Sequence, residues 1–188
     1  MDSYYSSHEL IAIGIKKMGK NLKISKKAAL YGCERMEFGD NVRVDDFCVL
    51  SGKLIFGNNI HITCFCLLAG GDEGIFLHDF ATLAYGVRVF TRSDDYGGQT
   101  MANSTIPEKY RYNTIKETVM LGKHSIIGTS SVIFPGAHVN EGVSVGAFTL
   151  VTKPTDEWGI YVGIPAKRIR DRQKDLLVQE LDYITTTE

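Results

Sequence analysis

The chain has 188 residues, of which 44% are hydrophobic and 23% charged, as in ordinary soluble globular proteins. Its formal net charge of −1 excludes the strongly basic composition of many nucleic-acid-binding and membrane-surface proteins. No apolar stretch approaches the roughly 20 residues needed to span a bilayer, and residues 1–18 lack the features of a secretory signal peptide. We therefore expect one domain (residues 1–188) in the cytoplasm, with no nucleic-acid partner and no stable membrane insertion.

The cysteine pattern indicates neither a disulfide framework nor a metal site. The four cysteines are Cys33, Cys48, Cys64 and Cys66, and none belongs to a CxxC pair. The CxC spacing of the last two is a weak metal signal without a partner cluster. We expect reduced, mostly buried thiols and no metal requirement.

The first predicted element is a short amphipathic helix over residues 8–18 (HELIAIGIKKM), within an N-terminal cap of residues 1–23. Ile24 and Leu30 follow the cap and begin an imperfect apolar repeat. We expect the helix to cover the open end of the structure that the repeat forms.

From Phe38 onward, apolar residues recur every six positions. These anchors are Phe38, Val44, Leu50, Phe56, Ile62, Leu68, Leu77, Leu83, Val89, Leu121, Ile127, Ile133, Val139, Val145 and Val151. Small or mostly β-branched residues follow most anchors by four positions: Val42, Cys48, Ile60, Cys66, Ala81, Val87, Ser125, Ser131, Ala137, Val143 and Thr149. Two breaks interrupt the register, a three-residue insertion within residues 69–75 (AGGDEGI) and a long polar segment at residues 91–118.

A period of six is neither helical nor simple strand alternation. It suits short strands joined by tight turns, with three strands in each coil of 18 residues and coils stacked about 4.8 Å apart. The sequence therefore predicts an all-β fold, a parallel β-helix over residues 24–156 with the anchors stacked inside a triangular prism. Cys48 and Cys66, one coil apart, should then stack in one internal column.

Two segments lie outside the repeat. Residues 91–118 are rich in Gly, Asn and Tyr, and a loop of this length in a compact domain is usually functional or disordered. Residues 157–188 should form a C-terminal helix and tail. The apolar pattern of residues 165–183 predicts that this helix lies over the last coil.

The repeat resembles that of the hexapeptide-repeat acyltransferases, and within them the maltose, galactoside and polysaccharide O-acetyltransferases. The resemblance covers roughly residues 38–170. It implies a left-handed parallel β-helix, a homotrimer, and transfer of an acetyl group from acetyl-CoA to a sugar hydroxyl, in polysaccharide biosynthesis for example. Two alternatives stay open, an N-acetyltransferase of an amino-sugar nucleotide and a catalytically silent scaffold. A zinc carbonic-anhydrase-like β-helix would need an H-x4-H pair, which this sequence lacks.

Acyl transfer to an acceptor requires a general base, for which neutral histidine is the usual choice. His61 directly precedes the inward anchor Ile62, and the resemblance implies that residues 57–63, including Thr63, contact the acceptor. The same resemblance places a catalytic histidine at the start of the long loop, where this chain has no histidine but TRSDDY at residues 91–96.

Three interpretations of this departure remain. His61 could be the base, with Asp94 or Asp95 holding its imidazole. One of the two aspartates could itself be the base, which requires a raised pKa from partial burial or from its like-charged neighbour. Catalysis could also be lost. The resemblance further assigns Ser93 and Tyr96 to acceptor binding.

For the CoA donor, the resemblance implies backbone contacts from the C-terminal coils to the pantetheine arm, at Gly128, Thr129, Gly146 and Ala147. It also implies that Thr152 and Lys153, together with Lys167 and Arg170 of GIPAKRIR (residues 163–170), lie at the CoA end of the site. Point charges and forked donors suit phosphate oxygens, so these cations should face the CoA phosphates.

Overall fold

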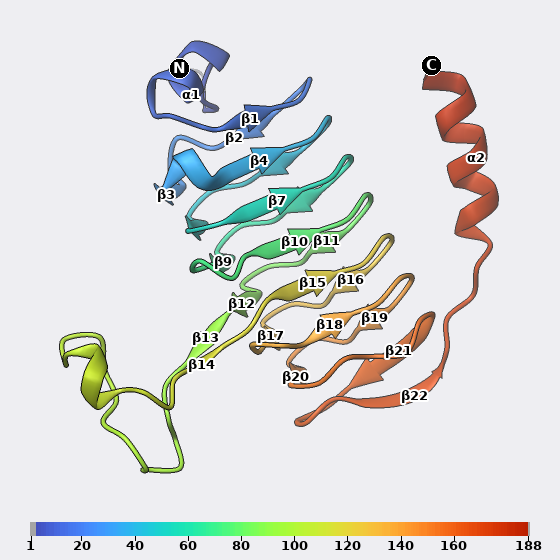
Figure 1. Ribbon diagram of the computed structural model, residues 1–188. Helices are drawn as coiled ribbons and strands as arrows, with labels where there is room; N and C mark the ends of the chain where they lie inside the picture. The colour runs from blue at the N-terminus through green and yellow to red at the C-terminus, as the bar shows by residue number, and fades with distance from the viewer. Residues whose placement is uncertain (1–2, 188) are drawn as a thin grey trace.

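The computed structural model describes residues 3–187, which wind into a parallel β-helix with three sheets (Figure 1). The first sheet contains β1 (Lys17–Met18), β4 (Met36–Phe38), β7 (Leu54–Phe56), β10 (Ile75–Leu77), β15 (Val119–Leu121) and β18 (His138–Val139). The second contains β2 (Lys23–Ile24), β5 (Arg43–Val44), β8 (His61–Ile62), β11 (Thr82–Leu83), β16 (Ile126–Ile127), β19 (Ser144–Val145), β21 (Gly159–Val162) and β22 (Lys167–Asp171). The third contains β3 (Ala29–Tyr31), β6 (Val49–Ser51), β9 (Leu67–Ala69), β12 (Arg88–Phe90), β17 (Val132–Ile133) and β20 (Leu150–Val151).

The hexapeptide anchors form the core of this prism, as the sequence predicts. All fifteen are buried, the most accessible being Phe56 at 4%. In the first sheet Phe56 pairs in register with Phe38 on one side and Leu77 on the other. Equivalent columns run through the other two sheets, so burial of each anchor supports the next coil. The predicted fold is confirmed.

The two stacked cysteines lie within this core. Cys48 and Cys66 are fully buried, and each thiol donates a hydrogen bond to a backbone carbonyl, of Thr63 at 3.1 Å and of Ala84 at 3.2 Å. The interaction with the Cys66 thiol, and after it burial, raise the pKa of the Cys48 thiol. Both thiols therefore have a packing role, as expected.

The corner between the first and second sheets is built from residues in the left-handed backbone region. Asn21, Asn41 and Asn59 all have φ near +56°, which asparagine tolerates better than most residues. Their amides form a ladder, with Asn21 Nδ2 donating to Asn41 Oδ1 at 2.9 Å and Asn41 Nδ2 to Asn59 Oδ1 at 3.2 Å. Phe80 and His124 continue the column with stacked rings 4.9 Å apart.

The N-terminal helix is shorter than predicted. Helix α1 covers Ser7–Ala12, opened by a capping box in which Ser6 and Glu9 bond each other's backbone. Gly14, at φ +86°, turns the chain out of the helix. Lys17–Met18 then pairs with Glu37–Phe38, so the first coil begins at Lys17 and the predicted boundary at residue 24 is wrong.

The C-terminal segment also differs from the prediction. Residues 167–171 form strand β22, which pairs antiparallel with β21 and covers an otherwise open sheet edge; the β-helix therefore continues past residue 156. Helix α2 (Leu176–Thr187) begins only afterwards. It runs back along the side of the coils toward the N-terminal end rather than over the last coil (Figure 1). Tyr183 Oη contacts Asn59 Oδ1 at 2.9 Å, which fixes this path.

The long polar segment leaves the prism between β12 and β15 and projects from its side (Figure 1). It contains the antiparallel pair β13 (Arg92–Ser93) and β14 (Ile115–Lys116) and a 3-10 turn, η2 (Glu108–Tyr110). Within residues 3–187, neither helix has the length and apolar character that a membrane crossing requires.

Candidate functional site

A cavity of about 530 Å³ lies where the projecting loop meets the C-terminal coils. Its lining joins four residues predicted at the acceptor side with one predicted at the CoA side: Ser93, Asp94, Asp95, Tyr96 and Thr152. Phe134, Pro135 and Ile115 contribute apolar wall. The structure therefore brings these two predicted groups together, although more than fifty residues separate them in sequence.

Asp95 holds the loop's turn together. Its carboxylate accepts hydrogen bonds from the backbone N–H groups of Gly97 and Thr100, each at 2.8 Å. These bonds, that from Thr100 above all, lower the pKa of Asp95. In the single chain, therefore, Asp95 does not have the raised pKa that the role of base requires.

Asp94 is held less tightly. Among the described residues, the one donor to its carboxylate is the backbone N–H of Asn103, at 3.0 Å. Asp94 lines the 530 Å³ cavity and also a neighbouring one of about 550 Å³. Its carboxylate is the better placed of the two to accept a proton from a bound molecule. Tyr96, by contrast, is 91% exposed in the single chain.

His61 lies elsewhere, on the outer face of the second sheet. Its Nε2 is 2.8 Å from Asp45 Oδ2, and Arg43 Nε donates to Asp45 Oδ1 at 2.6 Å. Within one chain, therefore, Asp45 holds the imidazole, not Asp94 or Asp95 as predicted. Asp45 was missed, although its place 16 residues before His61, close to one coil length, is a signal that could have identified it.

Thr63, predicted to contact the acceptor, is 9% exposed at the corner after β8. Its Oγ1 is buried and has no hydrogen-bond partner among residues 3–187. The hydroxyl of Thr63 is therefore closed off from solvent in the single chain.

The predicted CoA-binding residues divide between two corners. Thr152, Lys153 and Lys167 line a second cavity of about 260 Å³, and Thr152 is common to both cavities. Gly128, Thr129, Gly146 and Ala147 stack at the corner between the second and third sheets, where a side chain on Gly128 would come within 2.5 Å of the Ala147 nitrogen. Arg170 is exposed on β22.

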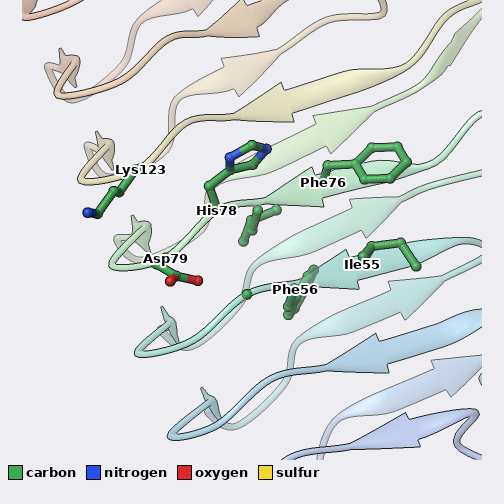
Figure 2. Close-up of a pocket in the computed structure, with 8 residues that line it drawn as sticks. Ile55, Phe56, Phe76, His78, Asp79 and Lys123 are labelled. Atoms are coloured by element: carbon green, nitrogen blue, oxygen red, sulfur yellow. The ribbon is translucent and has the colours of Figure 1, made fainter.

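A further cavity, of about 380 Å³, lies on the outer face of β7 and β10 (Figure 2). Ile55 and Phe76 form its apolar part, while His78, Asp79 and Lys123 stand at its polar edge. It contains none of the predicted site residues. In the part of the chain that the structure describes, no group of three or more His, Cys, Asp or Glu side chains could hold a metal ion.

Comparison with known proteins gives both near-full-length and local relatives. No known family profile matches the chain. The dTDP-4-amino-4,6-dideoxy-D-glucose acyltransferase of Escherichia coli is 36% identical over 180 residues, 95% of this chain and 93% of that protein. A chloramphenicol acetyltransferase of Agrobacterium fabrum is 39% identical over 56 residues, 30% of this chain and 27% of that protein.

Solved structures agree with these relatives. AntD, an N-acyltransferase from Bacillus cereus in complex with dTDP and 3-hydroxybutyryl-CoA, matches with a TM-score of 0.96 and 41% identity, covering 100% of this chain and 99% of its own. Another AntD structure, 42% identical, contains dTDP-4-amino-4,6-dideoxyglucose and coenzyme A. A hexapeptide-repeat acetyltransferase from Vibrio cholerae, 14% identical with a TM-score of 0.50 over 86% of this chain and 77% of its own, shares the fold.

Proposed function

The chain belongs to the hexapeptide-repeat acyltransferases, and on this premise we propose that it transfers an acyl group from an acyl-CoA to the amino group of dTDP-4-amino-4,6-dideoxyglucose. The similarity to the Escherichia coli acyltransferase over nearly the full length of both chains supports this acceptor. The AntD complexes with dTDP, the amino sugar nucleotide and CoA species support both substrates.

This proposal replaces O-acetylation of a sugar hydroxyl, the first expectation from the sequence, with its alternative, N-acylation of an amino-sugar nucleotide. The relatives matched over nearly their full length act on, or are bound to, an amino sugar nucleotide. The likeness to chloramphenicol acetyltransferase covers only 30% of the chain. Acetyl-CoA stays the proposed donor, with 3-hydroxybutyryl-CoA as the rival that the AntD complex suggests.

The observation that carries the proposal is the junction of two cavities at Thr152. On one side lies the Asp94 carboxylate, and on the other Lys153 and Lys167, cations suited to the CoA phosphates. A thioester held along the second cavity would meet an amine held in the first. Bringing two reactants together in this way is itself a large part of catalysis.

In the reaction we propose, the amine nitrogen attacks the thioester carbonyl carbon. A C–N bond forms, the C–S bond breaks, and CoA leaves as the thiol. The nitrogen must lose a proton, and we assign its removal to the Asp94 carboxylate because Asp95 is committed to backbone donors. The protonated Asp94 then gives this proton to the leaving sulfur, so that CoA departs as the thiol and the carboxylate is regenerated. In two AntD structures an aspartate is replaced by alanine or by asparagine. These variants support a role for an aspartate in that enzyme.

We also propose that the working site lies between subunits of a homotrimer. The single chain separates His61 and Asp94, and it splits the predicted CoA residues between two corners. The corner after the second sheet carries a column of exposed aromatic side chains, Phe47, Phe65, Tyr85 and Phe148, each at least 50% exposed. Clustered exposed apolar side chains often mark association surfaces, so a second copy is the natural partner for this corner.

The four cysteines support a further proposal, that the reaction takes place in the cytoplasm. Cys33, Cys48, Cys64 and Cys66 are all free thiols. Disulfides are rare in reducing compartments, where free thiols of this kind persist.

The test of this function measures CoA thiol release with three acceptors. The purified protein is supplied with acetyl-CoA and either dTDP-4-amino-4,6-dideoxyglucose, the same nucleotide sugar with a hydroxyl at C4, or chloramphenicol. We expect thiol release with the amine acceptor and little with the other two. Release with chloramphenicol alone would reject the proposed acceptor, and release with none would return the chain to the silent-scaffold interpretation.

A further inference from the structure

The three-residue insertion within residues 69–75, between β9 and β10, lies beside the point where the projecting loop leaves the prism. Strand β9 pairs with β12, after which the loop begins. The N–H of Thr91, the first loop residue, donates to the carbonyl of Ala69 at 3.2 Å. Where the loop returns, the N–H of Val119 donates to the carbonyl of Gly74, also at 3.2 Å. Both ends of the loop are thus bonded to residues at the ends of the insertion.

Two acidic side chains of the insertion form ion pairs with Arg92, the first residue of β13. Arg92 Nε donates to Glu73 Oε2 at 2.9 Å, and Arg92 Nη2 donates to Asp72 Oδ2 at 2.6 Å. Arg35, from an earlier coil, donates to the other Asp72 oxygen at 2.6 Å. A planar guanidinium held by two carboxylates is fixed in direction as well as in place. The Glu73 side chain is only 16% exposed.

Gly71 makes room for this arrangement. Its φ is +53°, and a Cβ built on it would lie 2.4 Å from Glu73 Oε2 and 2.8 Å from Arg92 Nε. Any side chain at this position would therefore push the carboxylate and guanidinium apart. The absence of a side chain at Gly71 therefore permits the ion pair between Glu73 and Arg92.

A few further hydrogen bonds hold the base of the loop, among them Glu117 N–H to the Thr91 carbonyl at 2.9 Å and the Thr118 hydroxyl to the Glu73 carbonyl at 3.1 Å. The β13–β14 ribbon contains only two residue pairs, Arg92 with Lys116 and Ser93 with Ile115. A two-stranded ribbon of this size is marginally stable by itself. Asp94 directly follows Ser93, the last residue of β13, so a small rotation at Arg92 would displace the Asp94 carboxylate.

We propose that Asp72 and Glu73 are positioning residues, which we call the clamp. They hold Arg92 and thereby direct Asp94 into the 530 Å³ cavity, where the acceptor amine is proposed to bind. This inference rests on the proposed function, because it concerns the placing of the proposed base. Asp72 is 74% and Arg92 42% exposed, so their ion pair should add little to overall stability. Their effect should instead appear in kcat, because misplacing a reacting group by about 1 Å can cost on the order of a hundredfold in rate.

The first test compares Glu73→Gln and the double variant Asp72→Asn/Glu73→Gln with Glu37→Gln, which removes an ion pair with Lys16 far from the loop. We expect the clamp variants to lose roughly tenfold to a hundredfold in kcat with the amine acceptor, at unchanged acetyl-CoA KM and unchanged Tm. The Glu37 control should keep its kcat. Clamp variants with wild-type kcat would overturn the inference.

The second test asks whether Arg92 acts through Asp94. Arg92→Ala is measured in the wild-type chain and in Asp94→Asn. If Arg92 only aims Asp94, its loss should cost much in the first background and little in the second. Equal losses in both backgrounds would mean a general structural role and would contradict the inference.

A third readout does not depend on activity. Lys109 and Arg111 give trypsin two cleavage sites in the loop, and a loosened loop base should raise the cleavage rate in Glu73→Gln but not in Glu37→Gln. If the wild-type protein proves inactive with the amino sugar, the proposed function fails while this comparison still decides the clamp. Equal cleavage rates would reject the clamp.

Discussion

Adjacent carboxylates in the loop have different environments, which predicts different effects on substitution. Asp94→Asn keeps the shape and the acceptor for Asn103 N–H but removes the proposed base, so kcat should fall by roughly 10²- to 10⁴-fold with little change in Tm. Asp95→Asn weakens the bonds to Gly97 and Thr100, so it should loosen the loop and raise its trypsin cleavage. Steady-state kinetics and limited proteolysis measure the two effects. A severe kcat loss in Asp95→Asn with an intact loop would reverse the assignment.

The His61–Asp45 pair predicts a second pattern. If His61 assists the reaction, His61→Ala should lower kcat, and Asp45→Asn should lower it less, because the amide oxygen can still accept a hydrogen bond from the imidazole. Arg43 provides a matched control, since Arg43→Lys keeps a cation beside Asp45. Wild-type kinetics in His61→Ala would remove this pair from the mechanism.

At the scale of single residues, the sequence predicted some partners and not others. Ser93 to Tyr96 and Thr152 were each placed at the site through resemblance, and the structure gathers them around one cavity. Asp45 and Arg92 were not singled out, because their roles depend on side-chain contacts across coils that no local motif encodes. The burial of Thr63 in the single chain has no local signal in the sequence either.

At the scale of elements, helix α2 is attached by a buried acidic residue. The Glu180 side chain is 9% exposed, with Oε2 2.8 Å from His124 Nε2 and Oε1 2.5 Å from Lys123 Nζ. Burial alone would raise the pKa of Glu180, but hydrogen bonds from Lys123 and His124 lower it overall. A carboxylate with a lowered pKa stabilises the folded state above the unfolded pKa of about 4.3, and this contribution is lost as pH falls below it.

We therefore predict that Glu180→Gln loosens α2 and that acid does the same to the wild-type protein. Hydrogen exchange of the α2 amides should be faster in the variant at pH 7, and the two proteins should converge as pH falls through about 4. The Thr185 hydroxyl, which bonds only backbone carbonyls of its own helix, offers Thr185→Ser as a control. Exchange that is unchanged by Glu180→Gln would mean that other contacts, such as that of Tyr183 with Asn59, hold α2.

Elements inside the repeat were predictable and those outside it less so. Each anchor is repeated one coil later, so fifteen independent positions agree on one register. Strand β22 and the path of α2 have no such repetition. The charged KRIRD segment has almost no apolar pattern to distinguish strand from helix, and Tyr183 contacts Asn59 across 124 residues of sequence. Neither the strand β22 nor the contact of Tyr183 with Asn59 is therefore signalled by the local sequence.

At the scale of the whole molecule, the trimer proposal predicts a specific complementation. If each site takes Asp94 from one copy and His61 from the next, Asp94→Asn and His61→Ala chains should each be weak alone. Co-expressed and purified through two affinity tags, the mixed trimers should recover roughly a third of wild-type activity, because each has one interface in three that pairs two intact residues. A site within one chain would recover none.

Light scattering on the same preparations supplies the matching physical measurement. We expect about three times the monomer mass for wild type and for the mixed sample. A stable monomer with full activity would contradict the shared site, because one chain keeps the two residues on separate faces.

The most direct test of the central claim is the identity of the bond formed. The protein is given acetyl-CoA and an equal mixture of dTDP-4-amino-4,6-dideoxyglucose and its 4-hydroxy analogue, and the products are resolved by mass spectrometry before and after mild alkali, which cleaves esters and spares amides. N-acyl transfer by Asp94 predicts an alkali-stable acetylated amino sugar nucleotide in wild type and very little of it in Asp94→Asn. An alkali-labile product on the hydroxyl analogue would contradict N-acyl transfer.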